Sequence, residues 1–215
     1  MFNLNEIKGL IFDCDGTLLD SMGAWDDAER DLFAEAGEMT FEEEAELHAS
    51  DIEDACAILH DRFGVGESSE ALFAYFEGIL MDFYSNKVKA LPGACELVRT
   101  AQDAGVPCVV LSSSPRRYLE AGLERAGILD CFAELVTTGE AGVPKTDPAI
   151  YRKAMDIMGS TLETTWAFDD AVYAVRVMES LGIRTVAPLN GRAGETEEQL
   201  REAATLVVNT LEELL

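Results

Sequence analysis

The spacing of apolar residues divides the chain into three stretches. Residues 7–12 form a short apolar run that ends at a glycine-containing loop, which is typical of a fully buried strand. Residues 21–88 instead carry apolar residues at helical spacing, in four segments broken near Gly37, Ser50 and Gly64. From residue 91 onwards, short apolar runs alternate with amphipathic helical segments, which predicts βαβ units on a parallel sheet.

These patterns predict an α/β protein with a doubly wound, mostly parallel sheet and an inserted four-helix domain. The sheet domain is expected to comprise residues 1–20 and 88–215, and the helical insertion residues 21–87. After the insertion, strands are expected at 106–111, 133–138, 164–168, 182–189 and 205–209. Helices are expected at 93–104, 116–127, after Asp147-Pro148, at 171–181 and near 196–202.

The charge balance limits the classes of partner. The chain has 41 acidic and 16 basic residues, a formal net charge of −25. This charge repels nucleic-acid backbones and anionic lipid surfaces, so we expect neither as a partner. A small phosphorylated substrate would need local positive charge or a bound cation. The chain has no apolar run of the ~20 residues that a membrane helix needs, and no secretory signal pattern, so we expect a cytoplasmic protein. Its five cysteines include no CxxC pair and are expected to be reduced thiols.

Polar residues follow each of the principal predicted strands. Asp13-Cys14-Asp15 comes after the first strand, Ser112-Ser113-Ser114 after the second, and Asp169-Asp170 after the fourth, while Lys145 precedes a helix in the third unit. Ligands of open parallel sheets bind at the carboxyl ends of the strands, so these groups are expected to meet on one rim. Each group has an ordinary explanation as a cap or a solvated side chain, and only their joint placement predicts a site.

The same residues resemble the motifs of the haloacid dehalogenase superfamily, over essentially the whole chain. The DxDGT motif stands here as residues 13–17, the Ser/Thr motif as Ser112, the motif lysine as Lys145, and the acidic pair as Asp169-Asp170. The resemblance is to the branch that contains phosphoglycolate phosphatase and β-phosphoglucomutase. It implies a Rossmann-like core with a helical cap inserted after the first strand, and phosphoryl chemistry.

The two leading carboxylates suit phosphoryl transfer on chemical grounds alone. Asp13, at the strand end, is the expected nucleophile, since a carboxylate can attack phosphorus in line and form an aspartyl-phosphate. Residues two apart in an extended chain point the same way, so Asp15 is placed to protonate the leaving oxygen and then to activate water. Crowded carboxylates push each other's pKa values apart. We expect Asp13, held by a metal ion and a lysine, to stay ionised and Asp15 to be able to hold a proton.

Such a group of carboxylates beside a phosphate calls for Mg²⁺. The expected ligands are Asp13, Asp15 through its backbone carbonyl, and Asp170, with Asp169 nearby. Lys145 would neutralise Asp13 and a phosphoryl oxygen, and Ser112 would donate its hydroxyl to another. Ser114-Pro115 is read as the cap and first residue of a helix whose free N–H groups favour an anion. The expected phosphate-binding residues are Gly16, Thr17, Ser113 and Ser114.

We expect the helical insertion to act as a lid, with hinges near residues 17–21 and 87–91. Met22, Trp25 and Phe83 are candidates for substrate contacts, although such residues more often pack in a core. The shortage of basic residues disfavours a bisphosphate as the principal substrate.

The sequence thus predicts a magnesium-dependent phosphatase of a small phosphomonoester metabolite, acting as a monomer through an aspartyl-phosphate. Two alternatives stay open. One is a sugar-phosphate mutase, although the mutases of this branch carry a histidine where Trp25 aligns. The other is a non-catalytic phosphate-binding regulator, although no key position has been lost. The substrate is not identified.

Overall fold

The computed structural model describes residues 2–40, 42–43, 47, 52–191 and 193–215. The chain divides into two compact units: Met1–Ser21 with Val88–Leu215, and Met22–Lys87. The first unit contains the sheet, and the described residues of the second are mainly helical.

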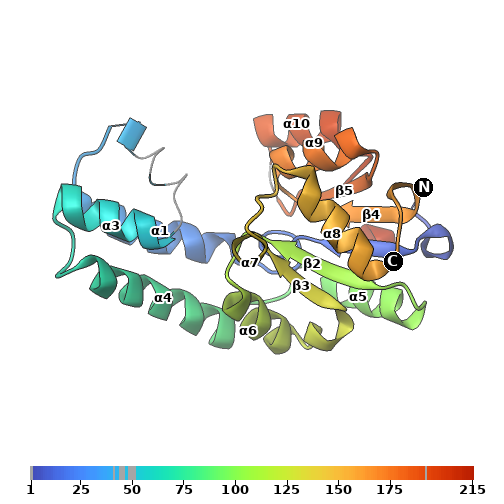
Figure 1. Ribbon diagram of the computed structural model, residues 1–215, viewed down its shortest axis with the longest axis horizontal. Helices are drawn as coiled ribbons and strands as arrows, with labels where there is room; N and C mark the ends of the chain where they lie inside the picture. Colours follow the sequence, from blue (N-terminus) through green and yellow to red (C-terminus); the bar gives the residue numbers. More distant parts are fainter. Residues whose placement is uncertain (1, 41, 44–46, 48–51, 192) are drawn as a thin grey trace. The chain divides into compact units, whose positions relative to one another are not determined.

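The larger unit is built on a parallel sheet of six strands in the order β3-β2-β1-β4-β5-β6 (Figure 1). The predicted doubly wound sheet is therefore confirmed. The chain order changes direction beside β1, which places the carboxyl ends of β1, β2 and β4 together. The strands are β1 (Gly9–Phe12), β2 (Cys108–Ser112), β3 (Glu134–Thr137), β4 (Thr165–Phe168), β5 (Arg184–Pro188) and β6 (Leu206–Val208).

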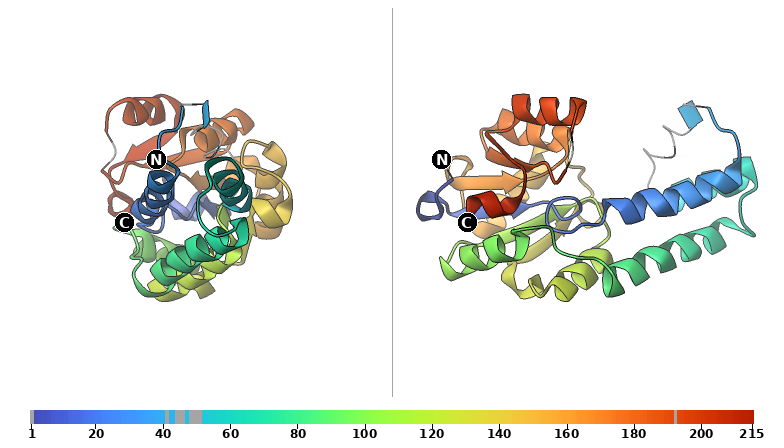
Figure 2. Two further views of the ribbon diagram at one scale, coloured as in Figure 1. Left: turned by 90° about the vertical axis from the view of Figure 1, so that its left-hand side faces the viewer. Right: turned by 180° about the vertical axis from the view of Figure 1, so that it is seen from behind.

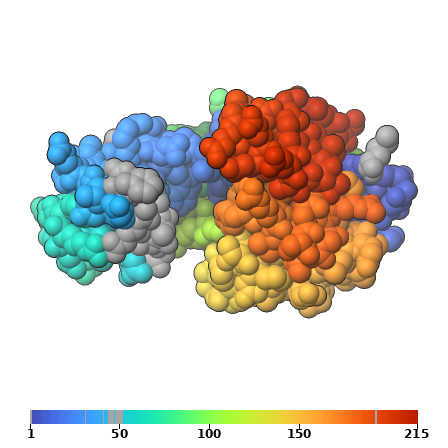
Figure 3. Space-filling model, turned by 90° about the horizontal axis from the view of Figure 1, so that it is seen from above, coloured from blue at the N-terminus to red at the C-terminus, as the bar shows by residue number. Residues whose placement is uncertain are grey.

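The central strands are buried along their whole length because helices cover both faces of the sheet. On one face, Ile11, Val109 and Leu111 pack in a core with residues of α8 (Pro148–Met158), α9 (Val172–Leu181) and α10 (Glu195–Ala203). Figure 3 shows the segments coloured yellow-orange to red, which include these helices, as one continuous surface. On the opposite face lie α5 (Ala94–Asp103) and α6 (Arg116–Ala126), and the short α7 (Thr138–Ala141) follows β3.

The helical unit is organised around its longest helix. Its described helices are α1 (Met22–Ala36), α3 (Ile52–Phe63) and α4 (Ser69–Asn86), and α4 packs against both of the others. The buried residues Leu72, Phe76, Leu80 and Tyr84 recur every four positions along α4, which explains the stripe that faces its neighbours. The predicted helical segment at 41–50 lies largely outside the described residues. Over the described part of the chain, no helix has both the length and the apolar character that a membrane crossing requires.

Trp25 packs within this helical unit. Its indole Nε1 donates to the Tyr84 hydroxyl at 2.8 Å, and its ring centroid lies 6.1 Å from that of Phe76. These contacts of Trp25 belong to the packing of α1 against α4, which is the core role that such residues usually have.

The C-terminal turn η4 (Leu211–Leu214) packs against the start of α5 (Figure 2). Gly93, which precedes α5, has a φ of +82°. A Cβ atom at this position would lie 2.2 Å from the backbone N of Glu212 and 2.5 Å from the backbone C of Leu211. Glycine is therefore required here both by the left-handed backbone and by the close approach of η4.

We predict that Gly93→Ala lowers the free energy of unfolding by about 3 kcal/mol or more, because a backbone clash is added to the left-handed strain. Gly105→Ala is the matched control, since Gly105 has a φ of +72° and nothing within 4 Å of the added Cβ. It should cost only about 1–2 kcal/mol. Urea unfolding of both variants measures the difference, and equal losses would contradict the inferred clash.

Candidate active site

Three carboxylates gather at the carboxyl ends of β1 and β4. Asp13 follows β1, and Asp169-Asp170 follows β4, which pairs with β1 in parallel register from Gly9↔Thr165 to Phe12↔Phe168. The ladder continues one step further, because the Asp13 backbone N–H donates to the Phe168 carbonyl at 2.8 Å. All three carboxylates are buried, and one oxygen from each lies within 4.8 Å of the others.

Lys145 lies against two of these carboxylates. Its Nζ donates to Asp13 Oδ1 at 2.5 Å and to Asp169 Oδ2 at 2.9 Å, and its side chain is only 4% exposed. Its backbone is also held, since the buried Tyr151 hydroxyl of α8 donates to the Lys145 carbonyl at 2.8 Å. The lysine and two of the carboxylates, far apart in the sequence, are therefore joined by direct hydrogen bonds.

Burial and charge act on the pKa values of this cluster in opposite ways. Burial raises the pKa of Asp13 and the neighbouring carboxylates raise it further, so its net shift is upward despite the lowering effect of Lys145. Burial alone would lower the pKa of Lys145, but Asp13 and Asp169 outweigh it and raise that pKa. The lysine is therefore held as a cation, while full ionisation of Asp13 calls for more positive charge than one ammonium group supplies.

The donor set fits a hard divalent cation. Asp13, Asp169 and Asp170 offer only carboxylate oxygens, the ligand type that Mg²⁺ prefers, and they are too crowded to be balanced by one lysine. These three residues are the candidate ligands for such an ion. The carboxylate of Asp15 has other partners, described next. The metal-binding role predicted for Asp15 uses its backbone carbonyl, and that role stays a prediction.

Asp15 lies in a different environment from Asp13. Its Oδ1 accepts from the Ser21 hydroxyl at 2.6 Å, and its Oδ2 accepts from the Ser114 hydroxyl at 2.7 Å. Ser114 is in turn tied to the end of β2, because its backbone N–H donates to Ser112 Oγ at 3.0 Å. The loops after β1 and β2 are thus joined through the Asp15 carboxylate.

One prediction about this loop was wrong. The helix α6 begins at Arg116, with Pro115 as its N-terminal cap, and Ser114 makes no capping bond. The Ser114 side chain is instead directed to Asp15, to which its hydroxyl donates. At the other predicted helix start the interpretation is confirmed: Asp147 caps α8 through a 2.8 Å bond from the Ala149 N–H to its side chain, and proline follows it.

The remaining residues expected to bind phosphate lie around the same loops. Thr17 is buried and its hydroxyl lies 3.5 Å from Asp170 Oδ1, the limit for a hydrogen bond. Gly16 has a φ of +81°, and its N–H donates to the Leu19 carbonyl at 2.9 Å. Ser112 is buried, whereas Ser113 is exposed.

Two further polar contacts were not predicted. The sequence places Ser21 only in a predicted hinge, yet its hydroxyl donates to Asp15. Asn190 follows β5, and its side-chain amide donates to the Gly16 carbonyl at 2.8 Å. Its backbone φ of +49° is in the left-handed region that asparagine tolerates better than most residues. The rule that placed the other groups, a polar residue just after a strand, would have found Asn190 as well.

The raised pKa of Asp13 predicts how the free energy of unfolding of the metal-free protein changes with pH. Its folded-state pKa lies above the ordinary value of 3.8, so the stabilisation that it gives is complete below that value and is lost as the pH rises through the folded-state pKa. Relative to Asp13→Asn, the free energy of unfolding of the parent chain should therefore fall with rising pH, by up to about 1.4 kcal/mol per unit.

The measurement is urea unfolding in EDTA from pH 4 upwards. Asp20→Asn, which removes an exposed carboxylate of the same loop, should run parallel to the parent chain. Saturating Mg²⁺ should flatten the slope. A gap between the parent chain and Asp13→Asn that widens in favour of the parent as the pH rises would contradict the assignment.

Comparison with known proteins finds phosphatases among the relatives of this chain. The bifunctional riboflavin kinase/FMN phosphatase of Arabidopsis thaliana is 25% identical over 193 residues, which cover 85% of this chain and 50% of that protein. Phosphoglycolate phosphatase of Rhodospirillum rubrum is 24% identical over 199 residues, covering 87% of this chain and 82% of the relative. This chain therefore spans most of some curated relatives but half or less of others.

The fold is shared with solved structures. CbbY from Rhodobacter sphaeroides, crystallised in complex with phosphate, aligns with a TM-score of 0.74 at 21% identity, over 97% of this chain and 96% of its own. A family IA HAD hydrolase from Entamoeba histolytica aligns with a TM-score of 0.75 at 16% identity, over 96% and 95%. A family model described as haloacid dehalogenase-like hydrolase matches residues 7–182. The chain belongs to the haloacid dehalogenase-like hydrolases.

Proposed function

We propose that this protein is a magnesium-dependent phosphatase that hydrolyses a small phosphomonoester through an aspartyl-phosphate on Asp13. The observation that carries the proposal is that two neighbouring carboxyl groups lie in different environments. Asp13 is bound to a buried lysine beside two further carboxylates, whereas Asp15 is bound to two hydroxyl groups. Different environments for two carboxyl groups are the usual basis for different catalytic roles.

In the first step, a carboxylate oxygen of Asp13 forms a bond to phosphorus while the bond from phosphorus to the ester oxygen breaks. Asp15 gives its proton to that leaving oxygen, which departs as a neutral alcohol. Lys145 compensates charge on Asp13 and on the transferring group, and the Ser112 hydroxyl donates to a phosphoryl oxygen. Ser21 and Ser114 fix the direction of the Asp15 carboxyl group.

In the second step, Asp15 takes a proton from a water molecule, whose oxygen forms a bond to phosphorus. The bond between phosphorus and Asp13 then breaks, which releases inorganic phosphate and restores both carboxyl groups. A divalent cation held by Asp13, Asp169 and Asp170 would supply positive charge to the transferring phosphoryl group.

A small phosphomonoester is the substrate class that these features favour. Relatives named as phosphatases of FMN and of phosphoglycolate match this chain. The formal net charge of −25 makes it costly to attract highly charged anions, so a compact monoester is a better candidate than a bisphosphate. Within this proposal the helical unit Met22–Lys87 acts as a lid that excludes water and selects the substrate.

The roles of Asp13 and Asp15 predict different kinetics for two matched variants. Asp13→Asn should abolish turnover, with a loss of about 10³-fold or more in kcat. Asp15→Asn should slow the hydrolysis of an alkyl phosphate by about 10²–10⁴-fold. With 4-nitrophenyl phosphate, whose leaving group needs no proton, Asp15→Asn should still release one equivalent of nitrophenol in a burst before slow turnover.

Stopped-flow absorbance at saturating Mg²⁺ measures the burst, and a phosphate assay measures turnover. Asp20→Asn is the control for a charge change in the same loop and should retain activity. Full activity of Asp15→Asn on the alkyl phosphate would refute its acid–base role. Turnover of glucose 1-phosphate to an isomeric sugar phosphate, in place of free phosphate, would favour a mutase over a phosphatase.

A further inference from the structure

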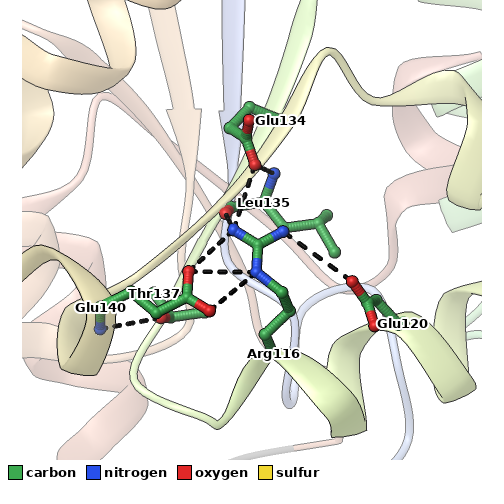
Figure 4. Close-up of polar contacts among 6 residues, drawn as sticks. All are labelled: Arg116, Glu120, Glu134, Leu135, Thr137 and Glu140. Carbon is green, nitrogen blue, oxygen red and sulfur yellow. Dashed lines mark hydrogen bonds and ion pairs between the residues drawn. The ribbon is translucent and has the colours of Figure 1, made fainter.

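We propose that Arg116 is a positioning residue for this reaction: its guanidinium fixes α7, and through it Lys145, relative to the end of β2 and the loop after it, which carry Ser112 and Ser114. The inference rests on the proposed function, since it assigns to Arg116 an effect on groups that act there. It is carried by the contacts of a single side chain with two other elements of the larger unit (Figure 4).

The strongest of these contacts is with Glu140 of α7. Arg116 Nε donates to Glu140 Oε1 at 2.8 Å and to Oε2 at 3.0 Å, and Nη2 donates to Oε2 at 2.8 Å. This is the forked geometry that guanidinium and carboxylate groups share, and an ammonium group cannot reproduce it. Arg116 also holds the pKa of Glu140 below its usual value, so the pair is charged at neutral pH.

The same guanidinium is bound to β3. Its Nη2 donates to the Leu135 backbone carbonyl at 2.7 Å and to Glu134 Oε1 at 3.1 Å. Glu120, one helical turn along α6, lies on the other side with its Oε1 3.9 Å from Nη1, which is an ion pair without a hydrogen bond. Arg116 thus binds α7 and β3 tightly and its own helix only weakly.

Arg116 and its partner Glu140 each lie close in the chain to residues of the candidate site. It is the first residue of α6 and lies two residues after Ser114, whose hydroxyl binds Asp15. Glu140 lies five residues before Lys145, whose ammonium group binds Asp13 and Asp169. One guanidinium therefore connects the backbone segments that present the serine and lysine groups of the site.

The Lys145 segment is held on both sides, and Arg116 adds to the contacts on its N-terminal side. On its C-terminal side, the Tyr151 hydroxyl holds the Lys145 carbonyl at 2.8 Å. On its N-terminal side, the four-residue α7 is capped by Thr137, whose hydroxyl accepts the Glu140 N–H at 3.2 Å, and is held from outside by Arg116. Pro144 then restricts the backbone just before the lysine, and on this proposal a displacement of α7 shifts Lys145.

The Arg116–Glu140 pair is partly exposed, so its effect on the position of Lys145 can be distinguished from its effect on folding stability. The side chains of Arg116 and Glu140 are 34% and 51% exposed, and ion pairs at such sites contribute little to the free energy of folding. A small displacement of a catalytic group, in contrast, can lower a rate by up to about 100-fold. We therefore expect loss of the Arg116–Glu140 pair to affect kcat far more than stability.

The test compares Arg116→Gln, Glu140→Gln and the double variant with Glu120→Gln, which removes the weakly bound carboxylate. Each of the first two single variants should lower kcat about tenfold with KM within twofold of the parent value, and the double variant should be no worse than either. Arg116→Lys should not recover the parent kcat, because a lysine cannot form the fork. Glu120→Gln should retain the parent kcat.

Hydrogen exchange of the same variants, read by mass spectrometry, tests the clamp without turnover. Peptides covering 138–147 should exchange faster in Arg116→Gln and Glu140→Gln than in Glu120→Gln, with the β1 and β4 peptides unchanged. Unchanged exchange at 138–147, additive losses of kcat, or a parent-like kcat in Arg116→Gln would each overturn the inference. If the parent chain itself releases no phosphate, the proposed function and Arg116's catalytic effect both fail, while exchange still reports whether the clamp exists.

Discussion

The contact between the buried Lys145 ammonium and the carboxylates of Asp13 and Asp169 is the interaction on which the site depends. Three carboxylates could not share a buried rim without compensating positive charge, because burial and mutual repulsion both disfavour their ionised forms. Lys145 supplies one positive charge at 2.5 and 2.9 Å, and a divalent cation would complete the balance. The same crowding that strains this cluster creates the field in which a phosphoryl group could be held and attacked.

The parallel sheet brings these carboxylates together, and the loops after its strands hold the neighbouring side chains. Paired strands place Asp13 beside Asp169, and the neighbouring β2 leads to the serine loop that holds Asp15. Around this buried centre lies a second set of contacts, including Asn190 on the Gly16 carbonyl and Arg116 on α7. The buried contacts determine the charges of the reacting groups. The more exposed contacts influence the positions of those groups through the backbone. We therefore expect the two sets to differ in their effects on stability and on rate.

The features best predicted from the sequence were those with a simple physical signature. Apolar runs and helical periodicity predicted the parallel sheet. The rule that polar residues follow strands predicted that Asp13, Asp169 and Asp170 lie together, as they do in the structure. Local cues were less certain: Ser114-Pro115 resembles a helix cap, but a tertiary contact with Asp15 claims the serine hydroxyl. No local pattern marks Arg116, because its principal partners, Glu134 and Glu140, lie 18 and 24 residues away in the sequence. An arginine on an amphipathic helix is ordinarily a solvated surface residue.

Trapping the phosphoryl group tests the central claim most directly. The parent chain is mixed with Mg²⁺ and 4-nitrophenyl phosphate, quenched in acid within milliseconds, and treated with borohydride, which reduces an acyl phosphate to an alcohol. Peptide mass spectrometry then locates the modified residue. We predict conversion at position 13 alone, in proportion to the phosphoenzyme present. Phosphate release with no conversion at that position, or with the phosphoryl group on Ser112, would contradict the account.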